Sequence, residues 1–336
     1  MACMEVWGGN RAIDNGVVMP GLDAWVFSLP YRHEGVAGDD DAGGDIHYVT
    51  SCATGRITRL IVADVSGHGA PVAKAADALR RLMRKHTNSI EQSDLVEKVN
   101  REFGMIGDAE QDSPGGGTLF ATAVVATYFS PTDELAVSNA GHPRPMRYDA
   151  KRGEWGANEP DERGQHRGGG HTNLPLGIIE DTTYPATSIH LRPDDLVLFY
   201  TDSLIEAKNA DGSLLGHEGL RRVLAEVDPA RPEVFVRELL GRISRLSEPR
   251  ATPSDLGRVF NDDVTALLVR RNALKPRPSI GLAMVAGVRI LREAIRSLLP
   301  GGEPASFPTL DRRSIGGAMN AQMNADENAK TNTPDG

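Results

Sequence analysis

The chain has 336 residues, of which 40% are apolar and 25% are charged, and its formal net charge is −9 at pH 7. This acidic balance argues against nucleic acid or an anionic membrane as the main partner. The two cysteines, Cys3 and Cys52, exclude a disulfide framework or a cysteine zinc site. The longest apolar run, 280–288, is shorter than the about 20 residues that span a bilayer, and residues 1–10 do not resemble a leader peptide. We therefore expect a cytoplasmic protein.

Taken in chain order, segments rich in Val, Ile, Thr and aromatic residues predict strands at 25–29, 46–51, 57–63, 121–129, 135–139, 196–201 and 264–269. Amphipathic periodicity predicts helices at 71–86, 93–104, 217–226 and 232–246. A turn sequence at 130–133 joins two of the strands into an antiparallel hairpin. The pattern predicts an α+β fold, a mostly antiparallel β-sandwich flanked by helices.

Composition also predicts how the chain is divided. The Gly-rich and charged stretch 150–172 is typical of a mobile loop. After about residue 274 the composition changes: 280–299 is compatible with an amphipathic helix, and 300–336 is polar and Asn-rich, which is typical of disorder. We expect one folded domain over 1–274 and a C-terminal helix with a disordered tail over 275–336.

Acidic residues stand at the ends of several predicted strands. Asp64 and Asp202 each follow an apolar strand, whereas Asp45 and the pair Asp262 and Asp263 each precede one. In an antiparallel sheet the end of one strand lies beside the start of its neighbour, so these carboxylates can gather at one edge. Gathered carboxylates repel one another unless a cation neutralises them. Aspartate is also common in turns, and for any one position that explanation is sufficient. For all of them together we favour a metal site.

Oxygen ligands with no nearby His or Cys pattern favour Mg²⁺ or Mn²⁺ over Zn²⁺. Gly67 and Gly69 follow Asp64 and would let the backbone pass close to a metal or a phosphate. The run is not a dinucleotide fingerprint, because Val72 stands at the third glycine position, and no P-loop motif occurs. The run 39–41 is interpreted as a solvated acidic loop.

Five short motifs contain these residues: Gly43-Gly44-Asp45, Asp64-Val65-Ser66-Gly67-His68-Gly69, Asn139-Ala140-Gly141-His142-Pro143, Thr201-Asp202-Ser203 and Asn261-Asp262-Asp263-Val264-Thr265. In this order and spacing they resemble the SpoIIE-like bacterial branch of the type 2C (PPM) metal-dependent serine/threonine protein phosphatases. The resemblance covers about residues 20–271. It implies two stacked antiparallel sheets flanked by helices, with two Mn²⁺ or Mg²⁺ ions at one edge, and it makes 1–274 the phosphatase domain.

The resemblance also implies roles for the metal-binding residues. Asp64 would bridge both ions, and the carbonyl group of Val65 would bind one of them. Asp202 and Asp262 would complete the other, and Asp45 would bind directly or through water. Gly44 and Asp263 are secondary positions. Asp263 would support Asp262, although which of these two aspartates binds is left open.

Two bound metals would lower the pKa of a shared water and clamp the phosphoryl oxygens for in-line attack. His68 would then be the general acid, or else a residue that only begins a helix. His142 is expected to stabilise its turn, and His47 to be an exposed strand residue. Arg56 and Arg59 are candidates for binding the phosphate group of the substrate. Ser203 stands where the family usually has glycine.

The leading functional hypothesis is hydrolysis of phosphoserine or phosphothreonine on a protein, the family's usual substrate being an anti-sigma-factor antagonist in a partner-switching pathway. A partner or homodimer formation would activate the chain, and helices 71–86 and 93–104 resemble the family's regulatory pair. One alternative is a non-catalytic module that keeps the fold and binds the partner. Another is a hydrolase of a small phosphorylated metabolite.

Overall fold

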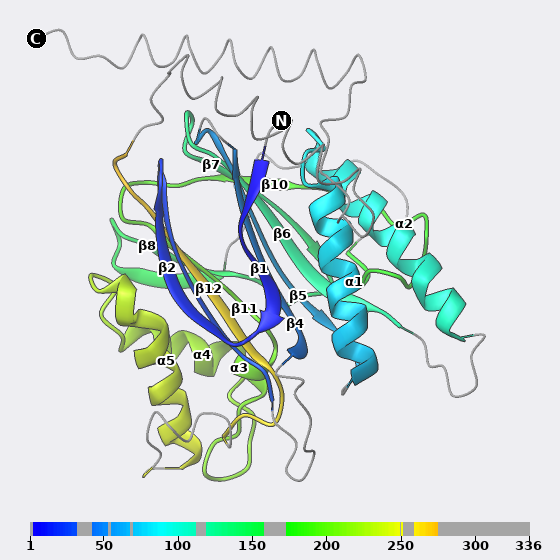
Figure 1. Ribbon diagram of the computed structural model, residues 1–336. Coiled ribbons are helices and arrows are strands. Elements are labelled where there is room, and N and C mark those ends of the chain that lie inside the picture. The colour runs from blue at the N-terminus through cyan, green and yellow to red at the C-terminus, as the bar shows by residue number, and fades with distance from the viewer. Residues whose placement is uncertain are drawn as a thin grey trace, which may run out of the picture.

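The computed structural model describes residues 3–31, 42–52, 55–67, 70–111, 119–157, 173–248, 250 and 259–274. In this part of the chain the strands form two six-stranded antiparallel sheets, stacked face to face, with helices on both outer sides (Figure 1). The predicted helix-flanked antiparallel sandwich is confirmed. None of the helices in the described ranges is long and apolar enough to cross a membrane. Of the loop expected over 150–172, residues 150–153 form a turn, 154–157 form the strand β9 (Glu154–Ala157), and 158–172 lie outside those ranges. Residues 275–336, for which a helix with a tail was expected, also lie outside them.

The first sheet has the order β1-β4-β5-β6-β7-β10 and the second the order β2-β3-β12-β11-β8-β9. The first contains β1 (Cys3–Arg11), β4 (Ala42–Cys52), β5 (Ile57–Val65), β6 (Ala121–Phe129), β7 (Glu134–Ala140) and β10 (Thr187–His190). The second contains β2 (Ile13–Met19), β3 (Leu22–Leu29), β8 (Met146–Asp149), β9 (Glu154–Ala157), β11 (Leu196–Tyr200) and β12 (Val264–Arg271). The helices are α1 (Ala70–His86), α2 (Gln92–Gln111), α3 (Ser203–Glu206), α4 (Gly216–Ala225) and α5 (Pro232–Ser247).

Alternation along the central strands separates the layers of the core. Leu60 and Val62 of β5 point into the space between the sheets, whereas Ile61 and Ala63 point toward α1 and α2. Successive side chains of a strand point to opposite faces, so a strand covered on both faces is apolar throughout. The inter-sheet layer therefore continues along β5 toward Asp64, whose position in the alternation matches that of Val62.

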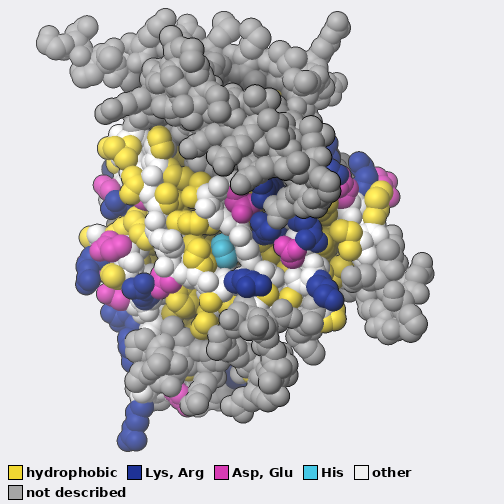
Figure 2. Space-filling view, in the orientation of Figure 1, with side chains coloured by type: hydrophobic (Ala, Val, Ile, Leu, Met, Phe, Trp, Pro, Cys, Tyr) yellow, Lys and Arg dark blue, Asp and Glu magenta, His cyan; other side chains and the backbone are white. Residues whose placement is uncertain are grey.

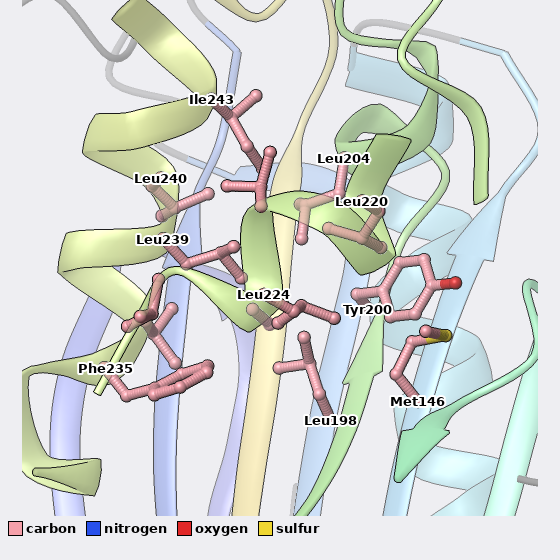
Figure 3. Close-up of a cluster of buried hydrophobic side chains, with 14 of the residues drawn as sticks. Met146, Leu198, Tyr200, Leu204, Leu220, Leu224, Phe235, Leu239, Leu240 and Ile243 are labelled. Atoms are coloured by element: carbon pink, nitrogen blue, oxygen red, sulfur yellow. The ribbon is translucent and has the colours of Figure 1, made fainter. Parts of the chain in front are cut away.

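The second sheet is covered by α4 and α5. Figure 3 shows Phe235, Leu239, Leu240 and Ile243 of α5 packed in one cluster with Leu198 of β11. These α5 residues recur at helical spacing, which is why the sequence predicts this helix correctly. On the face drawn in Figure 2, basic and acidic side chains are interspersed.

Arg59, on β5, is completely buried and holds the turn between α1 and α2. Its guanidinium donates to the Thr87 carbonyl at 2.8 Å and to the Ile90 carbonyl at 3.4 Å, and it also donates to the Ser89 carbonyl. The suggestion that Arg59 grips a phosphate is therefore wrong, because its donors face the carbonyl groups of this turn. Arg56 precedes β5, at the end of the strand opposite Asp64.

Arg59→Met is expected to lower the free energy of unfolding by about 3 kcal/mol, because it leaves buried carbonyl groups without donors. Chemical denaturation measures the change. Arg222→Met, at an exposed position on α4, is the matched control and should change stability by less than about 0.5 kcal/mol. Equal effects of the two substitutions would contradict the role given to Arg59.

Candidate metal centre

Two aspartates face one another at the end of the inter-sheet layer. Asp45 on β4 is the cross-strand partner of Asp64 on β5, and Asp64 is in turn the partner of Thr122 on β6. Directly opposite residues project from the same face of a sheet, about 5 Å apart. Asp45 is only 3% exposed, and Asp64 is partly exposed. The first sheet thus contributes a row of two carboxylates and a hydroxyl. The sequence predicted that Asp45 precedes its strand and that Asp64 follows its strand, but both lie inside, Asp45 in β4 and Asp64 in β5.

The second sheet brings the other predicted acidic residues to the same edge. Asp202 stands two residues after the end of β11, and Asp262 and Asp263 directly precede its antiparallel partner β12. The two sheets are joined here by the Thr201 hydroxyl, which donates to Asp45 Oδ2 at 2.8 Å. The predicted gathering of carboxylates from separate strands therefore occurs, and it occurs where the two sheets meet.

Asp263 fixes the backbone that leads into Asp45. Its carboxylate accepts hydrogen bonds from the backbone N–H groups of Tyr31 at 2.6 Å, Gly44 at 2.5 Å and Asp45 at 3.2 Å. We expected its side chain to support Asp262. The contact with Asp262 instead runs from the Asp263 backbone N–H to Asp262 Oδ1, at 2.8 Å. The Asp263 carboxylate therefore holds the backbone of Asp45 and not the side chain of Asp262.

A side chain would not fit at either of the two positions before Asp45, which are both glycine. A methyl group on Gly43 would lie 2.2 Å from Asp263 Oδ2. One on Gly44 would lie 2.9 Å from the Val65 carbonyl oxygen and 3.5 Å from Asp64 Oδ1. Gly44 therefore lets β4 approach the two oxygen atoms that the resemblance assigns to metal binding, and Gly43 makes room for Asp263.

Gly43→Ala is expected to cost at least about 2 kcal/mol of stability, because the added carbon overlaps a carboxylate that is held by three backbone donors. It should also weaken Mn²⁺ binding by displacing the Asp45 backbone. Gly156→Ala is a matched control on β9, since a methyl group there would meet nothing within 4 Å. Thermal unfolding and Mn²⁺ titration of both variants test this. Indistinguishable variants would refute the steric argument.

The pKa values of three carboxylates at this edge are raised. Burial raises the pKa of Asp45 well above its usual range, and Asp64 and Asp263 raise it further. Burial, followed by repulsion from Asp202, Asp262, Asp263 and Glu206, raises the pKa of Asp64 to about 8. Burial also raises the pKa of Asp202, with Glu206 adding to the effect. Among the described residues, Asp45, Asp64 and Asp202 form no ion pair with Lys or Arg. Bound cations would remove this repulsion.

The donor set fits a hard divalent cation, because it consists of carboxylate and carbonyl oxygens. Within the described ranges, no three acidic, histidine or cysteine side chains converge as they would in a closed metal cage. Mutual repulsion keeps bare carboxylates apart, and the Asp263 carboxylate is turned toward backbone N–H groups. The candidate ligands therefore lie at one edge of the sandwich, but their side chains do not form a closed coordination cage.

The histidines differ from one another in their surroundings. His68 lies outside the described residues. His142 is buried, exchanges two hydrogen bonds of 2.8 Å with Asn139, and so holds its turn as predicted. Its Nδ1 lies 2.8 Å from the Thr122 hydroxyl, and burial lowers its pKa to about 3. The expectation that His47 is exposed is wrong. It is 3% exposed because it lies on the same face of β4 as Val49, which points into the layer between the sheets, and burial lowers its pKa to about 4.

Sequence reasoning missed several contributors to the edge. Thr201 precedes Asp202 and could have been found as part of the Thr-Asp pair. Thr122 and Glu206 belong to no sequence motif. They contribute to the site only because the fold places them beside Asp64 and Asp202. Ser203, in place of the usual glycine, is buried with its hydroxyl 3.4 Å from that of Thr201.

The fold is that of the PP2C-type phosphatases. The RsbU and RsbW domains of Rv1364c from Mycobacterium tuberculosis align with a TM-score of 0.57 and 24% identity, over 84% of this chain and 70% of that one. The PP2C domain of Bacillus subtilis SpoIIE, with a fragment of its regulatory domain, aligns at 0.55 and 14%, over 77% and 64%. The SiaA PP2C domain of Pseudomonas aeruginosa aligns at 0.53 and 16%, over 74% and 86%. At these low identities, the structural alignments show a shared fold.

The sequence model of the family "Stage II sporulation protein E (SpoIIE)" matches residues 54–272, and the chain belongs to the SpoIIE family. A curated relative, "Phosphoserine phosphatase RsbU" of Bacillus subtilis (strain 168), is 22% identical over 251 residues. That match covers 74% of this chain and 63% of the relative's length, so the chain spans less than two thirds of RsbU.

Proposed function

We propose that this chain is a metal-dependent protein serine/threonine phosphatase that hydrolyses phosphoserine or phosphothreonine with a water nucleophile. The observation that carries the proposal is the buried pairing of Asp45 with Asp64, at the edge where Asp202 and Asp262 arrive from the other sheet. Within the described residues Asp45, Asp64 and Asp202 have no ion pair with Lys or Arg, and keeping such carboxylates close together is costly for a protein. Membership of the SpoIIE family supports a functional role for these carboxylates.

We propose that Asp64 bridges two divalent cations, Mn²⁺ or Mg²⁺, and that the Val65 carbonyl group binds one of them. Asp202 and Asp262 would complete the other, and Asp45 would bind directly or through water. Gly44 and Asp263 would serve as supporting positions. The Asp64 side chain lies in the row between Asp45 and Thr122, which suits the bridging role.

When bound, the two cations would acidify a water molecule and neutralise the charge of the phosphoryl group. The protein would hold the carboxylates for this purpose. Thr201 donates to Asp45 Oδ2, which orients that carboxylate. Since water is the nucleophile, no side chain needs to form a phosphoenzyme. We keep His68 as the proposed general acid that protonates the leaving serine oxygen.

For the substrate, we propose a phosphorylated protein of the anti-sigma-factor antagonist type in the cytoplasm, with a partner or homodimer formation as the activating event. The support is the name of the relative RsbU, a phosphoserine phosphatase, and the presence of RsbU and RsbW domains together in the Mycobacterium tuberculosis structure. Cys3 and Cys52 form no disulfide within the described residues, which suits a reducing compartment.

The test is an assay of the purified chain on a phosphoserine protein, an aryl phosphate and a panel of phosphorylated metabolites, with Mn²⁺ and with a chelator. We expect turnover of the phosphoprotein and the aryl phosphate that stops on chelation. Turnover of metabolites but not of phosphoprotein would favour a metabolite hydrolase. Partner binding without turnover of any substrate would favour a non-catalytic module.

A further inference from the structure

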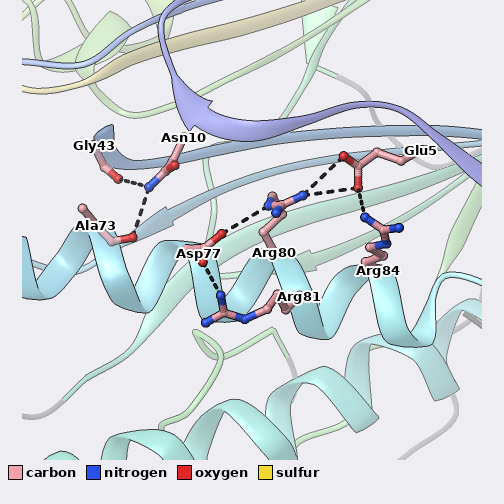
Figure 4. A network of polar contacts seen from close by, with 8 residues as sticks. All are labelled: Glu5, Asn10, Gly43, Ala73, Asp77, Arg80, Arg81 and Arg84. Atoms are coloured by element: carbon pink, nitrogen blue, oxygen red, sulfur yellow. Dashed lines mark hydrogen bonds and ion pairs between the residues drawn. The ribbon is translucent and has the colours of Figure 1, made fainter. Parts of the chain in front are cut away.

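A residue of the N-terminal strand contacts the metal-binding edge. Asn10, on β1, donates from Nδ2 to the Gly43 carbonyl at 3.0 Å and to the Ala73 carbonyl at 3.1 Å (Figure 4). Gly43 stands two residues before Asp45, and Ala73 lies in the first turn of α1, which follows the segment after Asp64. One amide group therefore joins the chain that leads into Asp45 to the chain that leaves Asp64.

The strand pairing explains why a side chain is needed here. β1 and β4 pair without interruption from Trp7 with Val49 to Gly9 with His47, but the next pair is Arg11 with Ala42, so the ladder is irregular at Asn10. On its other side, β4 begins to pair with β5 only at Asp45. Gly43 thus has no residue paired with it on either neighbouring strand. The Asn10 amide supplies the donor that the ladder does not provide for its carbonyl.

The same short segment is held from two directions. Asn10 binds the Gly43 carbonyl, and Asp263 accepts the N–H groups of Gly44 and Asp45. These two side chains come from opposite ends of the described chain and from different sheets. Together they fix both polar sides of the backbone immediately before a buried carboxylate. Groups that orient a metal ligand in this way usually contribute to metal affinity.

We propose that Asn10 is a positioning residue of the metal centre: it acts through Gly43 to hold Asp45 and so makes β1 part of the functional site. The proposal rests on the proposed function, since it assumes that Asp45 helps to hold the cation. It extends the site to a strand that precedes residues 54–272, which the family model matches. The sequence shows no motif at Asn10.

The test is the dissociation constant of Mn²⁺, measured by isothermal titration on the full chain. Asn10→Ala should weaken Mn²⁺ binding by on the order of tenfold, the lower range for residues that orient metal ligands. Asn10→Asp has the same shape but places an acceptor against two carbonyl oxygens, and it should weaken binding at least as much. Both should raise the Mn²⁺ concentration needed for half-maximal activity more than they lower activity at saturation.

The matched control is Glu5→Gln. Glu5 also joins β1 to α1, through Arg80 at 3.3 Å and Arg84 at 3.9 Å, but its ion pairs do not involve the Asp45 segment (Figure 4). It should leave Mn²⁺ affinity within about twofold, since these ion pairs do not touch the segment that holds Asp45. Unchanged affinity in Asn10→Ala would overturn the proposal, as would an equal loss in Glu5→Gln. A wild-type chain that binds no Mn²⁺ would instead refute the proposed function.

A second measurement covers the case in which the Asn10 variants do not fold. In a ¹⁵N spectrum of the wild-type chain, the Asn10 side-chain amide signals should shift when Mg²⁺ is added. The signals of Asn15, which lies on the exposed part of β2, should stay in place. An Asn10 amide that does not respond to a bound Mg²⁺ would overturn the proposal.

Discussion

Replacing Asp64 by Asn is expected to lower metal-dependent phosphatase activity by about 1000-fold or more. The substitution keeps the size of the side chain and removes one negative charge from the centre of the acidic row. Loss of a single preorganised electrostatic contact commonly costs 100- to 1000-fold in rate, and Asp64 is proposed to serve two cations at once. The measurement is kcat on an aryl phosphate at saturating Mn²⁺, with Mn²⁺ binding measured on the same sample.

Asp228→Asn provides the control for this prediction. Asp228 lies in the turn between α4 and α5, where its carboxylate accepts the Ala230 N–H at 2.9 Å. It is remote in the chain from every proposed ligand, and its substitution should leave activity unchanged. If Asp64→Asn remained as active as Asp228→Asn, Asp64 could not be the bridging ligand.

The second large effect concerns stability without metal. The ordinary pKa of an aspartate is about 3.9, and that of Asp64 is raised to about 8 in the folded chain. Between these values the unfolded chain releases its proton freely, whereas the folded chain must ionise against burial and repulsion. The contribution of Asp64 to stability therefore falls as the pH rises from about 4 to 8. Asp45 and Asp202, whose pKa values are also raised, act in the same direction.

Other groups titrate in this range, so the comparison must be made with Asp64→Asn. His47 and His142 have lowered pKa values, and their contribution is lost as the pH falls below about 6.5. Both proteins contain these histidines, so their effect cancels in the difference. In chelator, the variant and the wild type should have similar melting temperatures near pH 4.5, and at pH 8 the variant should melt about 5 °C higher.

Saturating Mn²⁺ should reverse the order at pH 8, because bound cations neutralise the wild-type carboxylates and the variant has lost a ligand. Thermal unfolding at several pH values, with chelator and with Mn²⁺, measures both effects. A difference between the two proteins that does not change with pH would show that Asp64 is not under electrostatic stress in the folded chain.

The sequence predicts the sandwich and most of the site because the relevant signals are local. Apolar runs that lead to Asp64 and Asp202 can be identified one at a time, and antiparallel pairing then brings them to one edge. The strands β1 and β2 were missed because Gly8, Gly9 and Gly16 interrupt their patterns and several of their other residues are polar. The short strands β8, β9 and β10 each have four residues, too few to establish a period.

The supporting contacts could not be predicted, for a different reason. Asp263 acts on a segment about 220 residues earlier in the chain, and its neighbour Asp262 looks the same in sequence. Asn10 acts at a break in strand pairing, which depends on the register of β1 against β4. Such contacts follow from tertiary geometry, and no spacing of residues along the chain encodes them.

The most direct test of the central claim is a crystal structure of the chain grown with Mn²⁺, with anomalous diffraction recorded to locate the metal. We predict two anomalous peaks beside Asp64, in contact with carboxylate oxygens of Asp202 and Asp262 and with the Val65 carbonyl group. Anomalous density at another surface of the molecule, or none at this edge under conditions in which the same preparation turns over phosphoserine, would contradict a two-metal centre.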